Sequence, residues 1–229
     1  MATISHDAPL VIESGPNPEL SVIFVHGLGT SGQHYTPLVR QWGKLISRPV
    51  RFILPTAEQR PVRLCDGQMV SAWFDLLTAD FNERVDVDGI RGAVDRLDRL
   101  IQGEIDTGQP SEAIFIAGFS QGGALSMLTA AQSPHRLGGA LVLSGWLPVA
   151  AVSGIKSLAH LPIFIGHGTF DPVTPLPMAK AAYDWLSRAG ATVDLHSYAM
   201  GHTIVDDEIR DIATWFDRRT ETIASPSGP

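Results

Sequence analysis

Short apolar runs alternate with longer stretches of helical periodicity along most of this chain. The runs are rich in Val and Ile and show little alternation, which is typical of parallel strands covered on both faces. They occupy residues 20–25, 50–54, 113–117, 140–143 and 163–165. Residues 192–198 alternate between apolar and polar side chains, which indicates an edge strand.

Helical periodicity appears between these runs. In one stretch the apolar residues recur every three or four positions and form a single face, at Ile90, Val94, Leu97, Ile101 and Ile105. Asp88 stands where its carboxylate can cap the first turn of this helix. Residues 175–189 and 204–218 are also predicted to be helical, and Gly190 suits the end of the first of these two helices. The alternation predicts an α/β domain with a mostly parallel central sheet and helices on both faces.

The predicted domain covers residues 1–220. Residues 221–229 are predicted to form a disordered tail, because they end in SPSGP. Residues 55–87 have no clean period and are interpreted as an excursion over the sheet. Excursions of this kind often shape binding sites.

Composition and charge narrow the class of protein. The 229 residues include 17 basic and 24 acidic side chains, giving a net charge of −7, and no basic block favours nucleic acid as a partner. Cys65 is the single cysteine, so no intramolecular disulfide is expected. No apolar run approaches the ~18 residues that span a membrane, and the N-terminus lacks the pattern of a secretory signal. We expect a cytoplasmic protein without a membrane span, either a monomer or a homodimer.

The sequence GFSQG places a serine between two glycines at the end of an apolar run. The run 113–117 predicts a strand, and the residues after the motif predict a helix. A Gly-x-Ser-x-Gly turn between strand and helix is typical of the nucleophile elbow, in which glycines at the flanking positions avoid collisions with neighbouring elements. The context therefore favours Ser120 as a nucleophile over an ordinary turn residue.

A serine nucleophile needs a histidine base and a carboxylate that orients the base. In this type of fold the chain order is Ser, then Asp or Glu, then His. Asp171 lies in the loop that follows the run 163–165, and His202 lies in a loop after the last predicted strand. These two residues are preferred to Asp184, Asp194 and His196, which fall inside a predicted helix or strand.

Two backbone N–H groups are needed to stabilise the oxyanion. One belongs to the residue after the nucleophile, Gln121. The glycine-rich loop after the first long strand supplies the other, which we assign to Leu28. His26 in this loop is interpreted as structural, because the triad does not need it. Loss of one such donor typically costs about 3–4 kcal/mol of transition-state stabilisation.

No cofactor or metal is predicted. His26, His34 and His167 do not follow a known metal-ligand spacing. Cys65 has no histidine nearby in a matching motif and is interpreted as chemically idle, and Lys180 as a solvated charge.

Seven motifs together resemble the carboxylesterase/acyl-protein thioesterase family of α/β-hydrolases. They run in the family's order from His26 to His202, as HGLG, LPTAEQRPV, AWFDL, GFSQGGALS, LSGWLP, HGTFDPVTP and MGHTI. The resemblance implies the α/β-hydrolase fold, with Ser120, Asp171 and His202 as the triad and Leu28 and Gln121 as the oxyanion donors. It also implies that the acyl pocket is bordered by the stretch 69–76 and by part of the motif LSGWLP, with Met69, Trp73, Phe74, Trp146 and Leu147 as the lining residues.

Two departures from the family concern the substrate. Thr30 stands where many members have Asp, and residues 78–88 match no familiar member. We expect a serine carboxylesterase that hydrolyses short- to medium-chain carboxylic esters, and acyl thioesters by the same chemistry, through an acyl-enzyme intermediate. The alternatives are a non-catalytic binding protein on the same scaffold and a related hydrolase of lactones or peptides.

Overall fold

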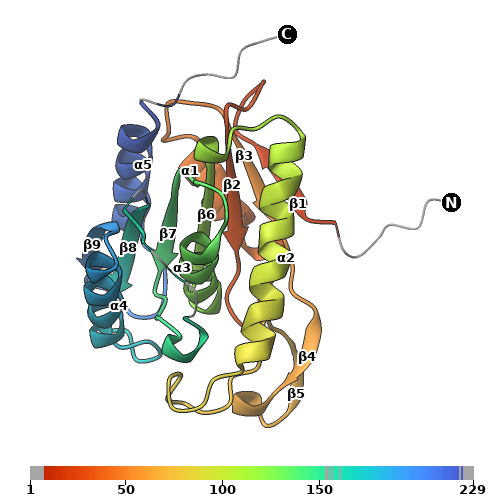
Figure 1. The fold of residues 1–229 in the computed structure, drawn as a ribbon, viewed down its shortest axis with the longest axis vertical. Coiled ribbons are helices and arrows are strands. Elements are labelled where there is room, and N and C mark those ends of the chain that lie inside the picture. Colours follow the sequence, from red (N-terminus) through yellow and green to blue (C-terminus); the bar gives the residue numbers. More distant parts are fainter. Residues whose placement is uncertain (1–7, 153–154, 156, 160, 222, 224–229) are drawn as a thin grey trace, which may run out of the picture.

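The computed structural model describes residues 8–152, 155, 157–159, 161–221 and 223. Most of the predicted disordered tail lies outside the described residues, so that prediction is untested. The described chain forms a seven-stranded sheet in the order β1-β3-β2-β6-β7-β8-β9 (Figure 1). The strands are β1 (Leu10–Glu13), β2 (Leu20–Val25), β3 (Val50–Leu54), β6 (Ile114–Phe119), β7 (Gly139–Leu143), β8 (Pro162–Gly168) and β9 (Thr192–Tyr198).

The sheet is parallel throughout except for β1, which pairs antiparallel with β3 at one edge. The predicted edge strand β9 lies at the other edge, and its burial is only partial. The central strands β2 and β7 are buried along their whole length, which explains why they appear in the sequence as continuous apolar runs.

Helices cover both faces of this sheet, as predicted (Figure 1). They are α1 (Thr36–Gly43), α2 (Val87–Asp106), α3 (Gln121–Gln132), α4 (Leu176–Arg188) and α5 (Asp206–Thr220). Buried residues of α2, α3 and α4 share one core with one face of the sheet, whereas those of α1 and α5 share the core on the other face. Short 3₁₀ helices are η1 (Gly32–Tyr35), η2 (Arg63–Cys65), η3 (Ser111–Ala113) and η4 (Val149–Ala151).

The capping residue of helix α2 lies two residues earlier than the proposed one. Asp86, not Asp88, is the capping residue, and its side chain accepts a hydrogen bond from the Gly89 N–H at 3.0 Å. The other carboxylate oxygen accepts from the Asp75 N–H at 2.9 Å. Asp86 therefore joins the start of α2 to the excursion, a tertiary contact that local sequence does not reveal. Ile90, Val94, Leu97 and Ile101 of the apolar face expected for this helix are buried, and Ile105 is partly buried.

The excursion contains an antiparallel hairpin that the sequence did not reveal, formed by β4 (Gln59–Val62) and β5 (Gln68–Ser71). Polar residues and Pro61 interrupt its alternation, so no strand period appears. The excursion packs at the end of the sheet where β2 and β6 finish, as the bond from the Gly29 N–H to the Ser71 carbonyl shows. It therefore borders the loops that carry the candidate site.

Candidate active site

Ser120 is placed between β6 and α3 in a strained backbone conformation. Its φ is 57° and its ψ is −120°, which is unusual for a residue with a side chain. The Ser120 N–H is held by the Leu143 carbonyl at 2.8 Å, and its own carbonyl accepts from the Ala124 N–H at 3.0 Å. The turn is thus fixed on both sides, and the hydroxyl stands at the carboxyl end of a central strand.

The glycines that flank this turn leave room for close backbone approaches. A Cβ on Gly118 would collide with the Gly122 carbonyl, and a Cβ on Gly122 would collide with the Val25 carbonyl of β2. Helix α3 can therefore start directly against the ends of β2 and β6. This is the geometry that the sequence motif indicated.

His202 and Asp171 complete a hydrogen-bonded chain with Ser120. His202 Nε2 lies 2.9 Å from Ser120 Oγ, and His202 Nδ1 lies 2.7 Å from Asp171 Oδ2. A carboxylate only accepts, so Nδ1 carries the proton and donates it to Asp171, leaving Nε2 free to accept from the serine hydroxyl. The Asp171 side chain is fully buried and that of His202 is 18% exposed. The three side chains are separated by 31 to 82 residues along the chain.

Asp171 is held by several donors from its own loop. The N–H groups of Val173 and Thr174 donate to Oδ1 at 2.8 and 2.9 Å, and Thr174 Oγ1 lies 3.0 Å from Oδ2. Burial raises the pKa of Asp171, but the hydrogen bonds from His202, Thr174 and Val173 outweigh it, so the pKa lies below its usual value. The carboxylate is therefore ionised and oriented towards the imidazole.

His167, which the sequence suggests only as a possible metal ligand, lies beside Asp171, with its Nε2 3.8 Å from Asp171 Oδ2. It is fully buried, and its Nε2 donates to the Thr174 carbonyl at 2.5 Å. Burial lowers its pKa, although the Thr174 carbonyl and Asp171 raise it in part. A neutral imidazole here supports the loop of Asp171 without competing for its charge. Thr174 and His167 are supporting residues that sequence reasoning missed, and only the Asx-type spacing of Asp171 and Thr174 could have indicated one of them.

The two proposed oxyanion donors lie beside Ser120. A Cβ on Gly27 would come within 3.4 Å of the Ser120 Cβ, so the loop of Leu28 passes directly against the nucleophile. Gln121 opens α3, where the first N–H groups of a helix have no partner within the helix. The Leu28 N–H has no hydrogen-bond partner among the described residues. Both N–H groups are thus free to bind an oxygen.

A network of buried hydrogen bonds holds the loop of His26 and Leu28 in place beside the start of α3. The Gln121 side chain accepts from the Trp73 N–H at 2.9 Å and donates to the Phe74 carbonyl at 3.0 Å. Trp73 Nε1 in turn donates to the His26 carbonyl at 3.0 Å. His26 Nε2 accepts from the Ala57 N–H at 2.9 Å, and burial lowers the pKa of His26 to about 4. His26 is therefore a neutral, structural residue, in agreement with the interpretation from sequence.

The residues expected at the acyl pocket do not all meet. Trp73, Phe74 and Trp146 are buried and form part of the main core. Met69 is 61% exposed on β5, where it pairs with Pro61 across the hairpin. Its role in substrate binding stays a prediction with no contact to support it, because the hairpin turns this side chain to the outside. Leu147 differs from the others because it lines an open cavity.

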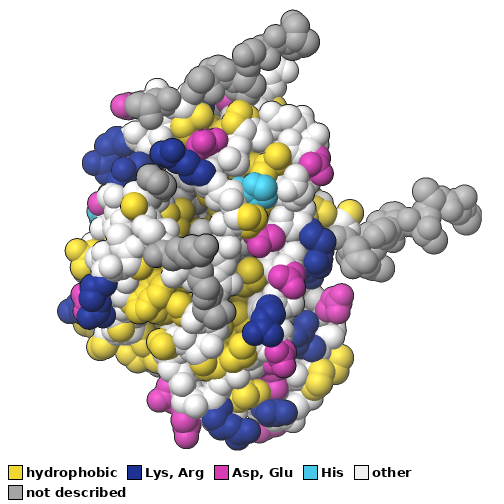
Figure 2. All heavy atoms as spheres, viewed as in Figure 1, with side chains coloured by type: hydrophobic (Ala, Val, Ile, Leu, Met, Phe, Trp, Pro, Cys, Tyr) yellow, Lys and Arg dark blue, Asp and Glu magenta, His cyan; other side chains and the backbone are white. Residues whose placement is uncertain are grey.

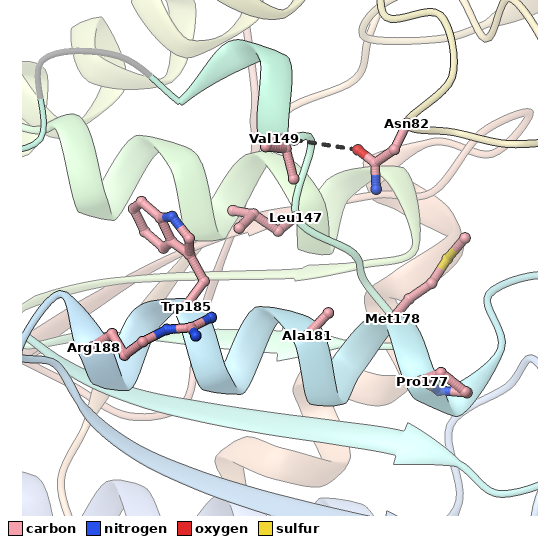
Figure 3. A pocket seen from close by; sticks show the side chains of 8 residues that line it. All are labelled: Asn82, Leu147, Val149, Pro177, Met178, Ala181, Trp185 and Arg188. Carbon is pink, nitrogen blue, oxygen red and sulfur yellow. Dashed lines mark hydrogen bonds between the residues drawn. The ribbon is translucent and has the colours of Figure 1, made fainter.

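This cavity has a volume of about 400 Å³ and lies between α4 and the loop after β7. Leu147, Val149, Met178, Ala181 and Trp185 give it an apolar wall (Figure 3). Hydrophobic side chains also gather on the surface beside α4 (Figure 2). Asn82 accepts a hydrogen bond from the Val149 N–H at 3.2 Å and completes the wall (Figure 3).

Two further observations concern metal ions and membranes. Among the described residues, no group of three His, Cys, Asp or Glu side chains is arranged to hold a metal ion. In the same part of the chain, no helix is both long and apolar enough to cross a membrane.

Comparisons with known proteins agree with this geometry. The family model of phospholipases and carboxylesterases matches residues 6–219. Acyl-protein thioesterase 1 of Gibberella zeae is 34% identical over 93% of this chain and 95% of its own. The carboxylesterase SOBER1 of Arabidopsis thaliana is 32% identical over 89% of this chain and 92% of its own.

The solved structures give the same result for the fold. The crystal structure of Arabidopsis thaliana SOBER1 superposes with a TM-score of 0.79 at 30% identity, covering 88% of this chain and 99% of that one. This confirms the α/β-hydrolase fold expected from the sequence. The chain belongs to the phospholipase/carboxylesterase family of α/β-hydrolases, and it is a serine-class hydrolase that acts on esters or thioesters.

Proposed function

We propose that this protein is a serine carboxylesterase for short- to medium-chain carboxylic esters, and that it also cleaves acyl thioesters. The observation that carries the proposal is the chain Ser120–His202–Asp171, with contacts of 2.9 and 2.7 Å, beside two free N–H groups. The catalytic unit is residues 1–220, which need no cofactor or metal. The cytoplasmic location and a monomeric or homodimeric state stay predictions.

The reaction follows from the geometry. His202 takes the proton of Ser120 as its Oγ attacks the ester carbonyl, while the N–H groups of Leu28 and Gln121 stabilise the oxyanion. Asp171 holds the imidazole and stabilises its charged form. His202 then protonates the leaving alcohol or thiol, and an acyl-Ser120 intermediate remains. Water, activated by His202, releases the acid and restores the serine.

The apolar cavity beside α4 is the proposed acyl site. Leu147 belongs to the residues that the family resemblance places there, and Asn82 anchors the loop that forms the opposite wall. Each buried CH₂ contributes about 0.8 kcal/mol, so kcat/KM should rise about fourfold per CH₂ until the cavity is full. Its limited volume favours short to medium chains.

The test is kcat/KM for p-nitrophenyl esters of increasing acyl length, together with one thioester. We expect a rise to a medium-chain optimum, and a shorter optimum for Ala181→Trp, which fills the cavity. Lys180→Trp is the matched control on the neighbouring, exposed position of α4 and should keep the wild-type optimum. A flat profile, or a preference for long-chain triglycerides, would contradict the proposal.

A further inference from the structure

A second cavity, of about 430 Å³, opens on the side of the site where His202 is exposed. Its walls come from η1, α1, the end of β6 and the start of α5, and include Tyr35, Leu38, Phe119, His202, Ile204 and Asp206. We call it the His202 cavity. We propose that it binds the alcohol or thiol part of the substrate, and that it selects an uncharged or cationic leaving group with an aromatic or branched apolar body. This inference rests on the proposed function.

The direction of the leaving group follows from the proton that it needs. In the tetrahedral intermediate the carbon carries Ser120 Oγ, the oxyanion, the acyl chain and the leaving heteroatom. The C–O or C–S bond breaks as the proton taken from Ser120 passes from His202 Nε2 to that heteroatom. The heteroatom must therefore lie within hydrogen-bond reach of Nε2, which is 2.9 Å from Ser120 Oγ. The body attached to it continues past His202, into a cavity that His202 lines.

The acyl chain takes the remaining direction. Among the described residues, the walls of the cavity beside α4 include none of Ser120, Asp171 and His202. The two cavities share no lining residue. Substitutions in one cavity can therefore be made without altering the wall of the other, so the acid part and the alcohol part of the substrate can be tested separately.

The walls of the His202 cavity suit a flat apolar group. The ring of Phe119 lies 4.8 Å from the ring of His202, and the ring of Tyr35 lies 6.3 Å from the ring of Phe119. Leu38 and Ile204 extend this surface from α1 and from the loop before α5. Aromatic side chains at such separations offer a large apolar contact area and preferred ring-packing geometries, and both favour an aromatic or branched leaving group.

The charged residues of the cavity wall determine which charged substituents the alcohol part of the substrate can bear. Asp206 lines the cavity, and one of its oxygens accepts from Gln41 Nε2 at 2.9 Å. No lysine or arginine is among the described residues that line it. A phosphate or sulfonate on the alcohol would face this carboxylate without a lysine or arginine to balance it, whereas an ammonium group would be attracted.

The experiment keeps the acyl group constant and varies the alcohol. Acetate esters of methanol, benzyl alcohol and two para-substituted benzyl alcohols are compared, one bearing trimethylammonium and one bearing sulfonate. Acetate release gives kcat/KM for each ester. Leu38→Trp fills the cavity and should lower the benzyl-to-methyl ratio of kcat/KM about tenfold. Arg40→Trp, on an exposed position of the same helix, should leave that ratio unchanged.

The charge is tested in the same assay. Asp206→Lys should lower the ratio of the cationic to the anionic ester about fivefold or more, the change expected for reversing one nearby charge. Asp207→Lys makes the same change in the same turn of α5 at a position outside the cavity wall, and should alter the ratio much less. Ile204→Trp fills the cavity from the opposite wall, so the result does not depend on one variant folding well.

Three outcomes separate the possibilities. If Leu38→Trp and Ile204→Trp leave the benzyl-to-methyl ratio unchanged while Ser120→Ala is inactive, the inference is wrong and the proposed function stands. If these variants shift the acyl-length optimum instead, the cavity holds the acid part and the inference is also wrong. If Ser120→Ala hydrolyses the esters as fast as the wild type, the proposed function itself fails.

Discussion

The side chain of Gln121 should be one of the most sensitive structural positions in the site. Its amide is fully buried and bridges α3 to the excursion through bonds of 2.9 Å from the Trp73 N–H and 3.0 Å to the Phe74 carbonyl. Gln121→Met keeps the length of the side chain and removes both bonds. One backbone N–H and one carbonyl are then left buried without partners, each at about 1–3 kcal/mol. The free energy of unfolding should therefore fall by roughly 2–6 kcal/mol.

Urea unfolding followed by tryptophan fluorescence measures this change. Gln102→Met is the matched control, because Gln102 donates to Asp106 at 2.7 Å on an exposed face of α2. That substitution should change the free energy of unfolding by less than about 0.5 kcal/mol. Equal losses in the two variants, or a loss under about 1 kcal/mol for Gln121→Met, would refute the idea that the bridge is a stabilising contact.

Three further predictions concern single residues. Asp171→Asn should lower kcat by about 10⁴-fold with the fold intact, because the histidine loses its oriented tautomer, while Asp184→Asn on the exposed side of α4 should stay near wild type in the same assay. Burial, and to a lesser degree the Asp211 carboxylate, raises the pKa of Glu208 from 4.5 to about 8. The folded protein keeps a proton that the unfolded chain releases, so the wild type should lose stability relative to Glu208→Gln as pH rises from about 4.5 to about 8. The loss in the free energy of unfolding should approach roughly 5 kcal/mol. Urea unfolding at pH 5 and pH 9 measures it, and an equal difference between the wild type and Glu208→Gln at both pH values would contradict the prediction. Cys65→Ser should retain most of the esterase activity, since Cys65 lies in η2 and packs against the core, and a large loss of kcat/KM in a folded variant would show that the thiol has a role.

The strands that sequence reasoning found are those whose burial is continuous or whose alternation is complete. Residues 20–25, 50–54 and 192–198 agree with β2, β3 and β9 to the residue. The antiparallel edge strand β1 has four residues with exposed ends, so its apolar pattern is too short to separate from a turn. The hairpin of β4 and β5 contacts the loop of Leu28 through the bond from the Gly29 N–H to the Ser71 carbonyl. A contact of this kind between distant segments produces no alternating pattern in the sequence of the hairpin.

Some residues of the candidate site could likewise be inferred from the sequence, whereas others could not. The positions of Ser120, Asp171 and His202 could be inferred because a strand end, a glycine turn and chain order constrain where a nucleophile, an acid and a base can stand. The supports of the site could not be inferred, because Thr174 and His167 matter only through the side chains that the fold brings to them. Pocket walls are harder still, since burial of Trp73 and exposure of Met69 depend on how the excursion packs.

The central claim is that Ser120 is the covalent nucleophile. Mass spectrometry of the protein after reaction with a fluorophosphonate tests it directly, because the reagent leaves an adduct on the serine that a nearby base activates. The adduct should lie on the peptide that contains GFSQGG, and Ser120→Ala should show neither labelling nor esterase activity. An adduct on another residue, or wild-type activity in Ser120→Ala, would contradict the account.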